Sequence, residues 1–267
     1  MKSFFDPEPR LLAHRGLPLE YPENTMISFE NAVKFGIDVI ETDTHLTRDN
    51  QFVICHDAEI SRISNGTGLI NNYTVEELKK FDAGYKFTRD EGKTYPFRDK
   101  NITFMTVEEA LKVFPDQKFN IDLKDNNPLQ VKYWAELIKK YDAEKRVLTA
   151  SQYTSNLMEV RKTFPGMATS FSAGEVFKFY IANKFGRLKT KMFEADAFQI
   201  PIRLGPFHLI RPKFIRNAHR LGFKLHIWTI NEQDIMKELF EMGIDAIFTD
   251  NPRLLKPVIK EKFDLIS

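Results

Sequence analysis

Two carboxylates and a histidine stand close together in the stretch DVIETDTHLTRDNQFVICHD, residues 38–57. Two apolar runs flank a polar break in this stretch, so we predict a pair of strands joined by a turn. Glu41 and Asp43 then point to the same face about 7 Å apart, which lets two carboxylates hold one cation. The second strand ends at His56, a candidate proton carrier. Taken alone, the stretch also fits an edge hairpin with solvated carboxylates, so the rest of the chain must decide.

The composition limits the classes of protein to which the chain can belong. Its 267 residues suit one α/β barrel, which takes about 250. The formal net charge of +2 gives no argument for a nucleic-acid partner. The single cysteine, Cys55, excludes an internal disulfide and a cysteine-based metal cage. The first ten residues, MKSFFDPEPR, do not resemble a secretory signal, so we expect a cytoplasmic protein. The oligomeric state is not indicated.

Strand-like and helix-like segments alternate along most of the chain. Strands are predicted to open at residues 10, 39, 119, 146, 166, 197, 224 and 246. Helices are predicted near 26–36, 75–81, 107–114, 131–141, 155–164, 211–221, 232–242 and 252–262, with Asn231 and Asn251 capping the last two. This alternation predicts an α/β protein, a (β/α)8 TIM barrel, with a doubly wound open sheet as the alternative. We expect a single domain, 1–267, with a small insertion after the second strand at about 57–105.

Polar side chains fall where the predicted strands end, which is where the active site of such a barrel collects. These residues are His14, Arg15, Glu41, Asp43, His56, Asp122 and Lys124, with Trp228 late in the seventh strand. Each one alone is compatible with a solvated face of a strand. Three carboxylates at inward-facing positions, however, predict a bound cation, because buried ionised groups are costly unless they are paired or bind metal.

Oxygen ligands favour a hard cation, Mg²⁺ or Ca²⁺, and leave the two histidines free as acid and base. A competing arrangement uses both histidines and one carboxylate as a facial triad for iron. That arrangement leaves Arg15 and Lys124 without a role, whereas two cationic side chains beside a divalent ion suit a phosphodiester whose charge grows in the transition state. The residues therefore predict metal-dependent cleavage of a phosphoester and do not indicate the substrate. A non-catalytic phosphate-binding barrel with the same metal is the alternative.

Eight short motifs occur in a fixed order along nearly the whole chain. They are HRG (14–16), PENT (22–25), ETD (41–43), HD (56–57), RISNGTG (62–68), IDLK (121–124), WTIN (228–231) and FTDNP (248–252). The ordered set resembles the glycerophosphodiester phosphodiesterase family. The resemblance implies a barrel with an insertion after the second strand, a divalent cation, and hydrolysis of a glycerophosphodiester to glycerol 3-phosphate and an alcohol.

The resemblance also implies roles for individual residues. His14 and His56 act as acid and base, with the neighbouring glycerol hydroxyl attacking phosphorus through a cyclic intermediate. The remaining roles are metal binding for Glu41, Asp43 and Asp122, phosphate contact for Arg15 and Lys124, support of the site for Glu23 and Asn24, and a wall of the site for Trp228. One position departs from the family, because the third carboxylate is commonly Glu and here Asp122 is shorter by one methylene.

The segment 177–216 interleaves aromatic and basic residues. They are Phe177, Phe179, Tyr180, Phe185, Phe193 and Phe207, with Lys178, Lys184, Arg187, Lys189, Lys191, Arg203, Arg211 and Lys213. An amphipathic helix that packs its phenylalanines on the barrel explains this composition. The alternative is a peripheral contact with an anionic membrane and a lysophospholipase D-like action on lipid substrates. Basic and aromatic residues together are also typical of sites for single-stranded nucleic acid, but nothing else in the chain supports such a partner.

Overall fold

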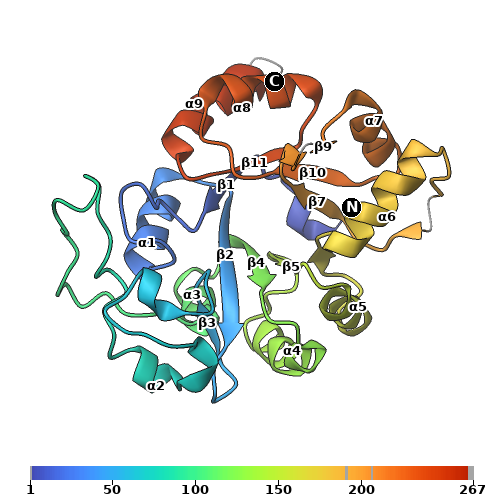
Figure 1. Ribbon diagram of the computed structural model, residues 1–267. Helices are drawn as coiled ribbons and strands as arrows, with labels where there is room; N and C mark the ends of the chain where they lie inside the picture. Colours follow the sequence, from blue (N-terminus) through green and yellow to red (C-terminus); the bar gives the residue numbers. More distant parts are fainter. Residues whose placement is uncertain (1, 190–191, 206, 264–267) are drawn as a thin grey trace.

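Eight parallel strands form a nearly closed barrel in the computed structural model, which describes residues 2–189, 192–205 and 207–263 (Figure 1). Neighbouring strands follow the order β6-β5-β4-β2-β1-β11-β10-β7. A bridge between Ser170 and Ala197 joins the two ends of this order. The barrel strands are β1 (Leu11–His14), β2 (Val39–Leu46), β4 (Lys118–Leu123), β5 (Val147–Ala150), β6 (Ala168–Thr169), β7 (Ala197–Ile200), β10 (Lys224–Ile227) and β11 (Ala246–Thr249). Each begins within two residues of its predicted start, so the predicted TIM barrel is confirmed and the open sheet is wrong.

Helices surround the barrel, as Figure 1 shows. They are α1 (Met26–Phe35), α2 (Val75–Leu78), α3 (Val107–Val113), α4 (Val131–Lys140), α5 (Thr154–Thr163), α6 (Ala173–Lys184), α7 (Pro212–Arg220), α8 (Gln233–Met242) and α9 (Pro252–Phe263). Thr74 and Thr106 begin their helices with capping boxes, as their spacing predicts. The predicted cap at Asn231 is wrong, because Glu232 precedes α8 and the Asn231 amide donates to Asp250 Oδ2 instead. No helix in the described ranges is both long and apolar enough to span a membrane.

The start of the chain fills the end of the barrel at which the parallel strands begin. Ser3–Phe5 forms a short 3-10 helix, η1, and Phe4 and Phe5 are buried among apolar residues of the strands. The ring of Phe5 lies 6.1 Å from the ring of His226 on β10, measured between centroids. This end of the barrel interior is therefore packed with side chains. The opposite end, where the parallel strands terminate, is left to hold polar groups.

The chain between β3 and α3 forms mainly turns and short helices. The strand β3 (Phe52–Ile54) pairs antiparallel with β2 and completes the predicted hairpin. It is followed by η2 (Ile60–Arg62), η3 (Ile70–Asn72) and α2. Buried apolar side chains form a cluster of their own here: Val53, Cys55, Ile60, Ile70, Val75, Leu78, Ala83 and Phe104. This cluster gives the segment a fixed shape beside the barrel.

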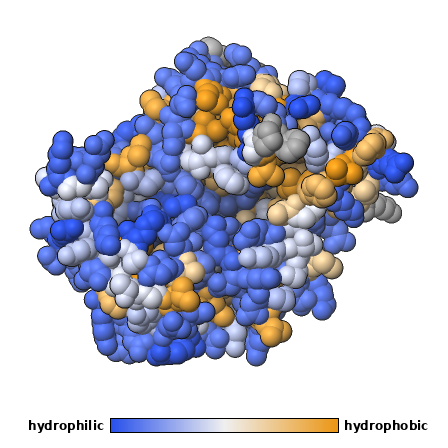
Figure 2. All heavy atoms as spheres, viewed as in Figure 1, coloured by the Kyte–Doolittle hydropathy of each residue, from blue (hydrophilic) through white to orange (hydrophobic). Residues whose placement is uncertain are grey.

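The phenylalanines of α6 divide between the core and the surface. Phe179 is fully buried against Phe198 of β7, with the ring centroids 4.7 Å apart, and Phe193 joins the same cluster. Phe177 and Phe185 are instead 67% and 62% exposed. The prediction that the helix packs its phenylalanines on the barrel is confirmed for Phe179 and wrong for Phe177, whereas Phe185 and Phe193 lie after the end of the helix. Lys191 and the side chain of Phe207 lie outside the described residues. Figure 2 shows apolar residues gathered on the side of the molecule that carries α6 and β9 (Phe207–His208).

Candidate active site

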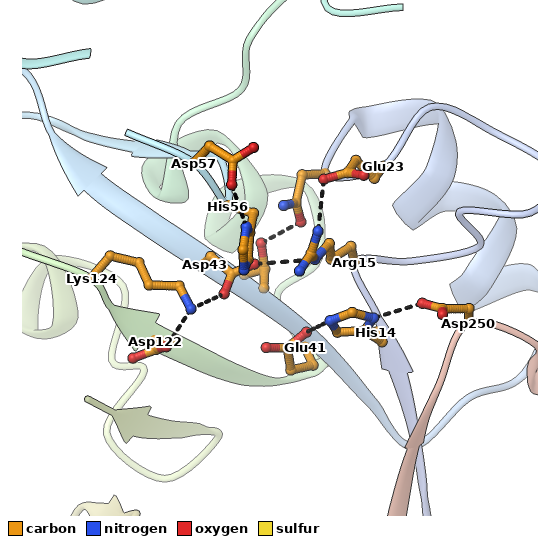
Figure 3. Close-up of polar contacts among 12 residues, drawn as sticks. His14, Arg15, Glu23, Glu41, Asp43, His56, Asp57, Asp122, Lys124 and Asp250 are labelled. Atoms are coloured by element: carbon orange, nitrogen blue, oxygen red, sulfur yellow. Dashed lines mark hydrogen bonds and ion pairs between the residues drawn. The ribbon is translucent and has the colours of Figure 1, made fainter. Parts of the chain in front are cut away.

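Strand register brings the predicted carboxylates together at the carboxyl ends of β1, β2 and β4. His14 pairs in register with Glu41, and Asp43 pairs with Asp122. Because alternate side chains of a strand share a face, Glu41 and Asp43 both point inward from β2. Figure 3 shows these four residues gathered in one place together with Arg15, His56 and Lys124. The structure therefore brings together seven of the ten residues that the sequence analysis selected.

The carboxylates form a buried cluster around one lysine. Lys124 Nζ lies 2.8 Å from Asp43 Oδ1 and 2.7 Å from Asp122 Oδ2. Arg15 Nε lies 3.4 Å from Asp43 Oδ2. Each carboxylate still keeps one buried oxygen without a hydrogen-bond partner: Glu41 Oε2, Asp43 Oδ2 and Asp122 Oδ1. Buried polar atoms without partners are rare, and at a site they indicate a missing ligand or ion.

Burial and crowding make the three carboxylates unequal. Burial, with the charge of Asp43, raises the pKa of Glu41 to about 8. Burial also raises the pKa of Asp122, despite the opposing charge of Lys124. Burial acts on Asp43 in the same direction, but the charges of Lys124 and Arg15 outweigh it, so the pKa of Asp43 is lowered. The cluster therefore does not hold three full negative charges at neutral pH without additional positive charge.

A hard divalent cation fits this donor set. The three oxygens without partners are carboxylate oxygens, which are the ligands that Mg²⁺ and Ca²⁺ prefer. In the part of the chain that the structure describes, no three His, Cys, Asp or Glu side chains stand close enough together to coordinate an ion. The ammonium of Lys124 lies between Asp43 and Asp122 and pairs with the other oxygen of each carboxylate (Figure 3). A cation bound here would share these two carboxylates with that ammonium.

The histidine that ends β1 is oriented by a carboxylate from the last strand. His14 Nδ1 lies 2.6 Å from Asp250 Oδ1, and the other ring nitrogen faces Glu41 Oε2 at 3.9 Å. Asp250 in turn accepts one hydrogen bond from the side-chain amide of Asn231, and its backbone N–H donates to Asn231 Oδ1. Burial lowers the pKa of His14, but the charge of Glu41 and the hydrogen bond to Asp250 outweigh it and raise the pKa. Asp250 lies in the motif FTDNP but was not predicted as a site residue; its position directly after a strand was the available signal.

The second histidine is paired in the same way with its own neighbour. His56 Nδ1 lies 2.6 Å from Asp57 Oδ1, and Figure 3 shows the His56 ring beside Asp43 and Arg15. The carbonyl of His56 faces His45 Nε2 at 3.2 Å, and His45 Nδ1 faces Asp125 at 2.8 Å. His45 and Asp125 were not selected from the sequence, although Asp125 directly follows the motif IDLK at the end of a predicted strand.

The loop after β1 supplies two further predicted residues. Glu23 accepts a hydrogen bond from Arg15 Nη1 at 3.0 Å, and the Asn24 side chain accepts one from Thr42 at 2.8 Å. Asn24 adopts φ 57°, a left-handed conformation that asparagine tolerates better than most residues. Trp228, which follows β10, is 43% exposed, so its side chain is available to line the site and does not fill the core.

Comparisons with known proteins agree with this geometry. The model of the glycerophosphoryl diester phosphodiesterase family matches residues 14–254. A glycerophosphodiester phosphodiesterase of Caldanaerobacter subterraneus is 30% identical over 260 residues, which cover 94% of this chain and 98% of that protein. A solved structure from Silicibacter pomeroyi superposes with a TM-score of 0.80 at 19% identity and covers 98% of each chain. A phosphodiesterase from Oleispira antarctica, solved in complex with the product sn-glycerol-3-phosphate, has a TM-score of 0.76 at 24% identity and covers 94% of this chain and 97% of that chain.

The matched region includes the predicted site residues from His14 to Trp228 and reaches beyond Asp250. The barrel, the order of its motifs and the similarity to these relatives agree with one another. The chain therefore belongs to the glycerophosphoryl diester phosphodiesterase family and is an enzyme of the phosphoric diester hydrolase class.

Proposed function

We propose that this enzyme hydrolyses glycerophosphodiesters to glycerol 3-phosphate and an alcohol, with His14 and His56 as general acid and base. The observation that carries the proposal is the pairing of each histidine Nδ1 with a carboxylate, Asp250 or Asp57, at 2.6 Å. A carboxylate accepts a hydrogen bond, so Nδ1 carries the proton and Nε2 is left to exchange one with substrate. Two oriented rings beside one charged cluster suit a reaction that needs one proton removed and another delivered.

The residues of the chain divide the reaction between them. One histidine takes the proton from the attacking hydroxyl while the other protonates the leaving oxygen, and each contribution is typically worth about 10²–10⁴ in rate. The side chains of Arg15 and Lys124 supply positive charge for the phosphate oxygens. Glu41, Asp43 and Asp122 hold a divalent cation, Mg²⁺ or Ca²⁺, which when bound adds charge stabilisation at phosphorus.

The substrate class is supported by the family and by its relatives. The Oleispira antarctica phosphodiesterase was solved with its product sn-glycerol-3-phosphate, and the Caldanaerobacter subterraneus relative is a glycerophosphodiester phosphodiesterase. Arg15 and Lys124 both pair with Asp43, so they are placed to supply positive charge to one phosphate group beside the carboxylate cluster. We therefore place specificity in the glycerol 3-phosphate half of the substrate.

The test measures release of glycerol 3-phosphate by the purified chain with Mg²⁺ or Ca²⁺, with a chelator, and after His14→Ala or His56→Ala. We expect each histidine variant and the chelator to reduce turnover by at least about 100-fold. His219→Ala is the matched control, because His219 also pairs with a carboxylate, Asp245, but lies outside the site. Turnover that survives both the chelator and the two histidine variants would refute the proposal. Binding of glycerol 3-phosphate without any turnover would favour the non-catalytic barrel.

Three broader predictions belong to the same proposal. Residues 57–105 are an insertion within a single domain of residues 1–267, which the separate apolar cluster around Ile60 and Phe104 supports. The protein works in the cytoplasm on a small-molecule substrate and does not bind nucleic acid. A peripheral membrane contact through α6 stays a prediction, supported by the exposed Phe177 and Phe185 next to exposed lysines.

A further inference from the structure

One side chain of the segment between β3 and α3 reaches two loops of the site. Arg62 ends η2, and its Nη1 and Nη2 donate to Glu23 Oε2 and Oε1 at 2.9 and 2.6 Å. Its Nε donates to Asp57 Oδ2. The guanidinium thus uses three donors of its planar fork to hold two carboxylates, one from the loop after β1 and one from the loop after β3.

Each of these carboxylates holds a residue of the site on its other side. Asp57 accepts from His56 Nδ1 at 2.6 Å, and Glu23 accepts from Arg15 Nη1 at 3.0 Å. A continuous chain of charge-assisted hydrogen bonds therefore runs from the imidazole of His56 to the guanidinium of Arg15, with Arg62 at its centre. Figure 3 shows its two ends, His56 and Arg15, close to Asp43.

The base of Arg62 is fixed by its own surroundings. Its neighbour Ile60 is fully buried in the apolar cluster of the segment. The side chain of Glu59 accepts hydrogen bonds from Ser61 N at 2.9 Å and Gly68 N at 2.6 Å, which closes the turn around η2. Arg62 therefore extends from a rigid support and transmits the position of that support to both loops.

We propose that Arg62 is a positioning residue that fixes the His56 ring and the Arg15 guanidinium relative to each other. The inference rests on the proposed function, since it assumes that these two groups act on one substrate. Arg62 is 45% exposed, and exposed ion pairs contribute little to folding stability. Its effect is therefore on geometry, where a misplacement of about 1 Å costs up to about 100-fold in rate.

The experiment compares kcat and KM for glycerol 3-phosphate release in four single variants and one double variant. Asp57→Asn loosens His56 and lowers kcat with little change in KM. Glu23→Gln loosens Arg15 and mainly raises KM. Arg62→Met changes both constants, with a loss of about 10-fold or more in kcat, and combining it with Asp57→Asn lowers kcat little further, because both changes break the same connection. Arg62→Lys keeps the charge without the fork and restores only part of the loss.

Arg48→Met is the matched control, since Arg48 is an exposed arginine that also grips a carboxylate, Glu77, through hydrogen bonds of 2.8 and 3.0 Å, yet contacts no residue of the proposed site. The inference is overturned if Arg62→Met has the same kcat and KM as Arg48→Met. Losses of Arg62→Met and Asp57→Asn that multiply in the double variant overturn it as well. A different result would be turnover that survives His56→Ala. That result would refute the proposed function itself, independently of the role of Arg62.

Discussion

Cation binding should depend on pH through one buried carboxylate. Burial and the neighbouring charge of Asp43 raise the pKa of Glu41 to about 8, so this side chain is protonated at neutral pH when no cation is bound. A cation held by Glu41 needs the ionised form, and binding must then release a proton. The affinity is therefore full above about pH 8 and falls as the pH is lowered. Each pH unit below the pKa costs about 1.4 kcal/mol, so the affinity at pH 6 should be roughly 100-fold weaker than above pH 8.

Isothermal titration calorimetry with Mg²⁺ and Ca²⁺ between pH 6 and 9 tests this reasoning. Titrations in two buffers of different protonation enthalpy report the number of protons released, which should approach one below pH 7. Glu41→Gln is the control, because an amide cannot titrate, so this variant should bind more weakly and lose most of the pH dependence. Equal affinities at pH 6 and pH 8, with no proton release, would show that Glu41 is not a ligand or is not protonated.

Three other predictions follow from separate parts of the structure. Asp250→Asn removes the carboxylate that orients His14 and should lower kcat at least about 100-fold, in steady-state assays compared with His14→Ala; near-normal kcat would contradict the pairing. Phe5→Ala leaves a cavity at the base of the barrel and should destabilise the fold by about 3 kcal/mol in denaturant unfolding, whereas Phe185→Ala, at an exposed position, should change stability by less than about 0.5 kcal/mol. Phe177→Ser with Phe185→Ser should abolish co-sedimentation with anionic phospholipid vesicles, and Leu129→Ser, at another exposed apolar position, should not; failure of the unmodified protein to bind vesicles would exclude the membrane contact.

The barrel could be predicted from the sequence because its strands carry a strong local signal. Most strands are short and rich in apolar residues, and the pairs that matter for the site, such as Glu41 and Asp43, follow from the two-residue period of a strand alone. The helix α6 was harder to locate. Phe177 and Phe185 place apolar residues on its exposed face, so the pattern that normally reveals the bounds of a helix is blurred.

The predicted site was less complete because its supporting residues depend on long-range contacts. Asp250 and His14 are 236 positions apart and meet only because β11 pairs with β1 when the barrel closes. A closed barrel requires that pairing, so two polar residues at the ends of the first and last strands could have been matched. Arg62 stands in the motif RISNGTG, but its role could not be predicted, because its position relative to the site depends on irregular turns whose conformation no periodic pattern specifies.

The charges of the site imply an order of binding. With Glu41 protonated, Asp43 and Asp122 bring up to two negative charges, which offset the two positive charges on Arg15 and Lys124, so the site without a cation has no net positive charge to attract an anion. A divalent cation would make the net charge positive and would weaken the pairing of Lys124 with Asp43 and Asp122, which leaves its ammonium available for phosphate. We therefore expect glycerol 3-phosphate to bind at least about 10-fold more tightly with the cation than without it, and the cation to gain the same factor from glycerol 3-phosphate. Calorimetric titrations of glycerol 3-phosphate with and without the cation, and of the cation with and without glycerol 3-phosphate, measure the two factors. An affinity for glycerol 3-phosphate that is the same with and without the cation would mean that the two ligands do not share this cluster.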